Sequence, residues 1–191
     1  MRLTVLTDGN LTPAQAELRR RIQAGPRGVG ATRGPFEIFL HAPAFGDIAQ
    51  QLGAHCRFGT SLPARLSELV ILITAAHWRC QYEWSAHRPI AERAGLSPAV
   101  IDVVHACGTP DFAEADERAV YAFVTELHTT LRVSNTTYQD LHAFLGDAGT
   151  VELLGILGYY TMIATMLNVF ESPPAAGQAP PFPDASPGAE G

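Results

Sequence analysis

Basic residues are scarce in this sequence, and so are cysteines. Thirteen Lys and Arg residues stand against nineteen Asp and Glu residues, which leaves a formal net charge of -6. Because a nucleic-acid-binding protein needs basic residues clustered on one face, this balance argues against a nucleic-acid partner. The three cysteines, Cys56, Cys80 and Cys107, are an odd number without framework spacing, so they argue against a disulfide scaffold.

The chain also shows no sign of a targeting or membrane segment. Its first ten residues lack both a basic stretch and an apolar run, unlike a secretion signal. Residues 151–170 are long and apolar enough to cross a bilayer, but Glu152 and Asn168 lie among them. A helix buried by its own protein or by a second subunit fits that composition better. We therefore expect a protein of the reducing cytoplasm with no membrane partner.

Charged residues make up only 17% of the chain and hydrophobic residues 47%, so there is enough apolar surface for a large core. The length of 191 residues suits one compact domain, although two small ones would also fit. Residues 1–34 hold an N-terminal helix and a glycine-rich loop, and residues 35–171 form a helical domain. Residues 172–191, rich in Pro, Ala and Gly, are expected to be a disordered tail.

The hydrophobic spacing is that of helices, and no stretch alternates as a strand does, so the predicted fold class is all-α. Thr12 and Pro13 start the first helix, and Gly95 is suited to ending another in a left-handed conformation. The run at 69–73 is too apolar for a one-sided helix and belongs at the centre of the core. One face of the second helix is apolar: Phe45, Ile48, Leu52 and Cys56. The predicted helices cover residues 12–24, 43–58, 61–78, 82–94, 97–107, 111–131, 135–145 and 150–170.

The glycine-rich loop at 25–34 invites comparison with a phosphate-binding loop. No strand is predicted before it, and no Gly-Lys-Ser/Thr follows it. We interpret it as an ordinary connection that carries two arginines.

Reactive side chains concentrate between residues 68 and 87. Cys80, Glu83 and His87 fall at i, i+3 and i+7, so a helix places all three on one face. Glu83 and His87 are four residues apart and could touch. A carboxylate beside an imidazole supplies a proton donor and acceptor that work near neutral pH. The Cys80 thiol, at a helix start and near an imidazole, would be favoured as thiolate.

Glu68 is a more distant candidate. On one unbroken helix it would lie roughly 18 Å from Cys80 and point to the side. It can join the site only if the chain turns back around residues 75–79, or if another subunit closes the gap. The alternative role is that of a carboxylate stabilised at a helix N-terminus.

Four further side chains in this window are candidates for binding a substrate: His77, Arg79, Tyr82 and Trp84. Tyr82 could donate a hydrogen bond, and Arg79 could bind an acidic group, although a surface position is the commoner one for an arginine. A metal site built from His77, Cys80, Glu83 and His87 would span close to three helical turns. No metal site is therefore predicted.

The spacing of Glu68, Cys80, position 83 and His87 resembles the carboxymuconolactone decarboxylase and alkylhydroperoxidase D superfamily, whose peroxidase branch has Glu-x11-Cys-x2-Cys-x3-His. The string Tyr-Glu-Trp-x2-His at 82–87 is similar to the decarboxylase-like branch, as are ELL-x3-GYY at 152–160 and LNVF at 167–170. The resemblance covers residues 35–170. It implies an all-helical fold that assembles into trimers or hexamers, with sites near subunit contacts.

One departure from the family pattern bears on function. Glu83 stands where the peroxidase branch has its second, attacking cysteine, so Cys80 has no partner for disulfide cycling. The resemblance then implies a cofactorless decarboxylase-like enzyme acting by acid–base catalysis on a small carboxylated or lactone substrate. Glu83 and His87 transfer protons in this hypothesis, Glu68 assists them, and Cys80 lines the pocket. The alternatives are a thiol hydroperoxidase that uses Cys80 and a non-catalytic protein that binds small molecules.

Overall fold

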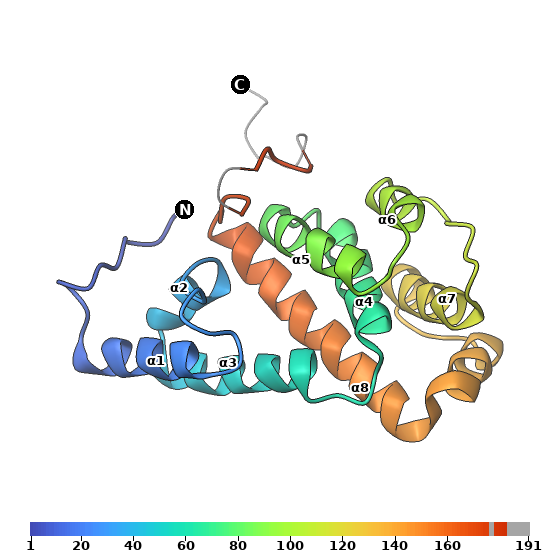
Figure 1. Cartoon of the computed structure of the whole chain (residues 1–191), viewed down its shortest axis with the longest axis horizontal. Coiled ribbons are helices and arrows are strands. Elements are labelled where there is room, and N and C mark those ends of the chain that lie inside the picture. Colours follow the sequence, from blue (N-terminus) through green and yellow to red (C-terminus); the bar gives the residue numbers. More distant parts are fainter. Residues whose placement is uncertain (176–177, 183–191) are drawn as a thin grey trace.

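The computed structural model describes residues 1–175 and 178–182, and within them it contains helices and no strand (Figure 1). The predicted all-α fold class is confirmed. The helices are α1 (Pro13–Ala24), α2 (Pro35–Leu40), α3 (Pro43–Phe58), α4 (Ala64–His77), α5 (Gln81–Arg93), α6 (Pro98–His105), α7 (Ala115–Thr130) and α8 (Asn135–Val169).

Local sequence signals account for several of the helix ends. The Thr12 hydroxyl accepts from the Gln15 backbone N–H, and the Gln15 side chain accepts from the Thr12 N–H, which forms a capping box at α1. Gly95 has φ +97° just beyond α5, as the sequence predicts. Helix α7 begins four residues later than predicted, because residues 111–114 run outside the helix and bury Phe112 in the core.

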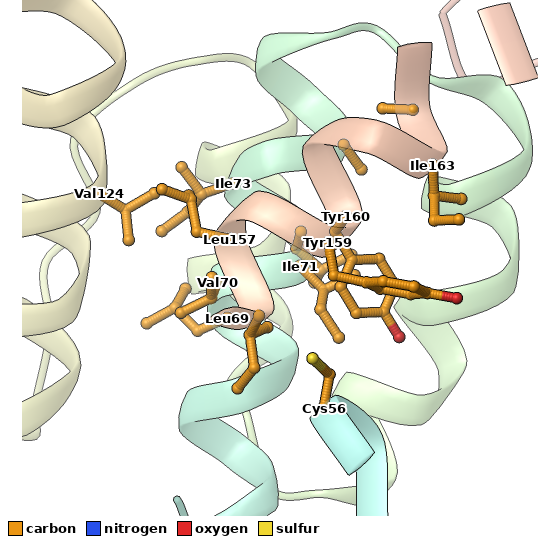
Figure 2. Packing of buried hydrophobic residues seen from close by; sticks show 14 of the residues in the cluster. Cys56, Leu69, Val70, Ile71, Ile73, Val124, Leu157, Tyr159, Tyr160 and Ile163 are labelled. Carbon is orange, nitrogen blue, oxygen red and sulfur yellow. The ribbon is translucent and has the colours of Figure 1, made fainter. Parts of the chain in front are cut away.

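Helix α4 is the centre of the molecule. It packs against α5, α6, α7 and α8, and its residues 69–73 are at most 6% exposed. Figure 2 shows this run beside apolar side chains of α8 and α7: Leu157, Tyr159, Tyr160, Ile163 and Val124. The prediction that 69–73 lies at the centre of the core is confirmed, because neighbouring helices cover α4 on nearly every side.

Helix α8 is long and bent. Gly146 has φ 60° and ψ -171° within it, so the two helices predicted at 135–145 and 150–170 are joined across a kink. By length and composition, α8 is the single helix of the described residues that could cross a membrane. Half of its most apolar window is buried inside this fold, which favours a core helix.

The apolar stripe predicted on α3 does not face the core as a whole. Cys56 is buried, but Phe45, Ile48 and Leu52 are 45%, 71% and 49% exposed. The buried side of α3 consists instead of small and polar residues: Gly46, Ala49, Gln50 and Gly53. Small side chains let α3 approach α1, α2 and α8 closely, which turns the larger ones outward.

The two ends of the described chain meet the body of the protein. The Arg2 backbone N–H donates to the Phe170 carbonyl at the end of α8, and the Arg2 guanidinium pairs with Glu171 at 2.7 Å. Disorder was predicted from residue 172 onward, yet residues 178–182 lie against α5 and Phe182 is only 2% exposed. Its large aromatic side chain supplies the apolar burial that the surrounding composition lacks. Residues 176–177 and 183–191 of the predicted tail lie outside the described residues.

Candidate active site

A tight turn brings the two halves of the predicted site together. Helix α4 ends at His77 and α5 begins at Gln81, with Arg79 between them at φ 47°. The chain thereby turns back on itself, and α5 packs along α4. Glu68 Oε2 lies 2.7 Å from Nδ1 of His87, nineteen residues later in the chain. The sequence left two ways for Glu68 to join the site, a turn of the chain or a second subunit, and the structure contains the turn.

The carboxylate partner of His87 is therefore Glu68, and the predicted direct contact between Glu83 and His87 is replaced by this longer-range pair. Both side chains are buried, at 5% exposure for Glu68 and 9% for His87. The His87 ring also packs against Tyr160 in a T-shaped pair, with centroids 5.1 Å apart. A hydrogen bond at Nδ1 fixes the ring orientation and leaves Nε2 as the nitrogen that can exchange a proton with another group.

Glu83 is buried without a compensating charge. It is 2% exposed, and neither carboxyl oxygen has a well-formed hydrogen bond within the described part of the chain. Burial raises the pKa of this carboxyl well above its usual 4.5, while the neighbouring Cys80 thiol lowers it by less. Because an unpaired buried carboxylate is costly, burial favours the neutral acid form of Glu83.

Glu83 and His87 open onto the same small cavity, whose volume is about 100 Å³. Two helices supply most of its wall, with further residues from α2, from the end of α3 and from the glycine-rich loop. The lining residues are Tyr82, Glu83, Ala86, His87 and Ile90 of α5, Tyr159, Tyr160 and Ile163 of α8, and Arg27, Pro35, Phe36 and Arg57. Buried acid and imidazole groups thus meet at a space that a small molecule or a few waters could fill.

Two arginines at this cavity were not identified as site residues from the sequence. Arg27 lies over the rings of Phe36 and Phe58, at 5.1 and 6.0 Å, and donates to the Gln50 carbonyl. Arg57 lies 5.1 Å from the centroid of Phe58. No carboxylate among the described residues forms an ion pair with either guanidinium, and burial lowers the pKa of Arg27. The two cations are thereby left to attract an anion entering the cavity.

The glycine-rich loop reaches the site through Gly34. This residue has φ 64°, and a Cβ placed on it would lie 2.3 Å from the ring of Tyr82. Burial raises the pKa of the Tyr82 hydroxyl, so it stays protonated and able to donate. The loop interpreted as an ordinary connection therefore supplies Arg27 and packs closely against Tyr82. No local sequence pattern indicates this role of the loop at the cavity, which becomes visible only in the tertiary fold.

Cys80 was predicted to line the cavity, but it is not one of the lining residues. It is the residue preceding α5, and it is fully buried. Burial raises the pKa of its thiol well above the usual 9.0. The expectation that the helix start would favour thiolate is wrong here, because desolvation outweighs the helix dipole.

The other predicted binding residues face away from the cavity, apart from Tyr82. His77 stacks on His128 across α4 and α7, with ring centroids 4.2 Å apart. Trp84 is buried against the ring of Phe182, and the Arg79 guanidinium lies over that ring. Within the described residues, no group of three or more His, Cys, Asp or Glu side chains could hold a metal ion.

Comparison with known proteins finds a family model that matches part of the chain. Residues 43–126 match the model of the carboxymuconolactone decarboxylase family, a range that includes Glu68, Cys80, Glu83 and His87. The likeness to this family is shown for residues 43–126. Arg27 and the tyrosines of α8 lie outside the matched range and complete the cavity.

A solved structure has the same fold as this chain. It is described as an alkylhydroperoxidase AhpD core, an uncharacterized peroxidase-related protein from Ralstonia eutropha JMP134. The TM-score is 0.74 over 92% of each chain, at 18% sequence identity, so the likeness concerns the fold alone. A search of curated proteins found no match.

Proposed function

We propose that the protein is a cofactorless, decarboxylase-like enzyme that uses acid–base catalysis on a small carboxylated or lactone substrate. The observation that carries this proposal is the buried Glu83 carboxyl, which lacks a hydrogen-bond partner among the described residues and lines a cavity together with His87. A buried acid with a raised pKa can deliver a proton at neutral pH, as a general acid must. The match to the decarboxylase family supports this reaction class.

In this proposal, Arg27 and Arg57 hold the negatively charged groups of the substrate. The bond between carboxylate and ring carbon breaks, carbon dioxide leaves, and the electron pair remains on the carbon conjugated with the lactone carbonyl. Glu83 then gives its proton to that carbon. His87, oriented by Glu68, returns a proton to Glu83 from solvent.

The conservative variant Glu83→Gln tests the acid directly, because it keeps the shape of the side chain and removes the transferable proton. We expect kcat for release of carbon dioxide from γ-carboxymuconolactone to fall about 10²- to 10⁴-fold. Wild-type activity should decline as pH rises through the raised pKa of Glu83, since only the protonated form donates.

Two controls accompany this measurement. Glu92→Gln alters an exposed carboxylate on the same helix and should leave kcat unchanged. Cys80→Ser should also leave it unchanged if the thiol has no part in the chemistry. Full activity of the Glu83→Gln variant would refute the assignment, and an absence of turnover in the wild type would favour a protein that only binds its ligand.

A thiol hydroperoxidase is the second candidate, because Cys80 adjoins Glu83 and the fold is that of a peroxidase-related protein. The complete burial of Cys80 and the raised pKa of its thiol count against it. Mild hydrogen peroxide followed by mass spectrometry separates the two functions. The peroxidase requires a sulfenate or mixed disulfide at Cys80, and its absence would remove this candidate.

A further inference from the structure

A groove on the outer side of α5 holds a short segment of the chain itself, residues 178–182. The Phe182 ring stacks on His105 at 4.8 Å and an interplanar angle of 21°, and it meets Trp84 edge-on at 5.6 Å. The guanidinium of Arg79 lies 5.4 Å from the same ring. Side chains from α5, from α6 and from the turn before α5 thus enclose one phenylalanine.

The backbone of this segment is bound as well as its side chain. The Gln81 side-chain amide donates to the Phe182 carbonyl and accepts from the Phe182 N–H at 3.0 Å, which pairs both backbone groups of one residue. The His105 Nε2 lies 2.9 Å from the Pro181 carbonyl. Main-chain hydrogen bonds combined with an aromatic pocket are how proteins recognise short extended peptides.

The sequence of the segment suits such recognition. Residues 179–182 read Ala-Pro-Pro-Phe, and proline restricts the backbone before binding, so little entropy is lost on docking. The groove continues along α5 beside Ser85 and Arg88, with a volume of about 360 Å³. The Ser85 hydroxyl is buried there and has no partner among the described residues. The groove therefore extends beyond the Phe182 pocket, and it contains the Ser85 hydroxyl, which has no hydrogen-bond partner among the described residues.

We propose that the face formed by Gln81, Trp84 and His105 is a recognition site for a Pro-Pro-Phe segment, and that residues 180–182 are its intramolecular ligand. The tethered segment has a high effective concentration and keeps competing peptides out. This inference does not depend on the proposed enzymatic activity.

Tryptophan fluorescence tests the proposal in the full chain. The protein has two tryptophans, so a Trp78→Phe background leaves Trp84 as the sole reporter. In that background, Phe182→Ala should shift the Trp84 emission to longer wavelength and raise its quenching by acrylamide. Adding a blocked peptide with the sequence of residues 178–182 should reverse both changes. The same peptide should have no effect on the protein with its native Phe182.

Matched variants decide between recognition and a loose contact. A peptide with alanine in place of its phenylalanine should bind about ten-fold or more weakly. Gln81→Ala, combined with Phe182→Ala, should weaken binding of the native peptide by about ten-fold, because two hydrogen bonds are lost. Phe144→Ala, at an exposed aromatic of α8, should leave Trp84 emission unchanged. An unchanged Trp84 signal in Phe182→Ala, or equal binding of both peptides, would overturn the proposal.

Discussion

Single ionisable side chains in this protein differ in how the fold accommodates their charge. Glu68 and His87 share a buried hydrogen bond, so each compensates the other. Glu83 has no such partner in the described part of the chain, and its raised pKa suits it to serve as an acid in the proposed reaction. His128 is a basic counterpart of Glu83, because it too is an ionisable group with buried polar atoms. Its two ring nitrogens are buried without hydrogen-bond partners among the described residues, and its ring is stacked on His77.

His128 should make the fold sensitive to acid. Burial, with a smaller effect of His77, lowers the pKa of His128 from 6.5 to about 4. As pH falls from 6.5, the unfolded chain takes up a proton that the folded chain refuses, so the free energy of unfolding drops until about pH 4. His128→Phe keeps an aromatic ring and should lose less stability than wild type over this interval, measured by urea unfolding.

The control for this measurement is His41→Phe, which replaces an exposed histidine. Its stability should follow the wild-type dependence on pH. If the free energies of unfolding of wild type and His128→Phe changed in parallel between pH 6.5 and 4, this would contradict the assigned role of His128.

At the scale of elements, the glycine-rich loop and α5 depend on each other. Gly34 adopts a positive φ and leaves no space for a Cβ beside Tyr82. Gly34→Ala should therefore cost about 1–2 kcal/mol of stability from the backbone alone. It should also displace Tyr82 from the cavity wall and lower kcat/KM in the assay proposed above.

Gly28→Ala is the matched control for that prediction. Gly28 also has a positive φ, 73°, in the same loop, but nothing lies within 4 Å of a Cβ at this position. We expect a similar loss of stability with kcat/KM retained. Equal losses of kcat/KM in the two variants would show that the Tyr82 contact does not matter.

The elements also show how far the sequence could predict the structure. Proline and hydroxyl signals define helix starts locally, so α1 and α3 were predicted within a residue. The pairing of Glu68 with His87 depends on a left-handed Arg79, a conformation that no propensity favours for arginine. Arg27 and the docked Phe182 reach their positions through long-range packing, which a local pattern does not record. The apolar face of α3 was identified from the sequence, but most of this face is exposed to solvent in the monomer.

For the whole molecule, we propose that copies associate through the outward face of α3. Phe45, Ile48 and Leu52 form an exposed apolar stripe of a kind that marks protein interfaces. Arg57, at the end of the same helix, lines the cavity, so association would place the site near a subunit contact, as the family resemblance implies. Ile48→Glu should reduce the mass measured by light scattering while the helical circular dichroism is retained.

Val29→Glu provides the comparison, because it adds the same charge at an exposed apolar residue of the glycine-rich loop. It should leave the assembly mass unchanged. If wild type and Ile48→Glu had the same mass, the α3 face would not be the site of association.

The pairing of Arg2 with Glu171 has a consequence for engineering. Because the start of the chain is bonded to the end of α8, the polypeptide path from one to the other is nearly a closed ring. A short linker between these points, with new ends opened in an exposed loop, would rearrange the order of the helices along the gene and preserve their order in space.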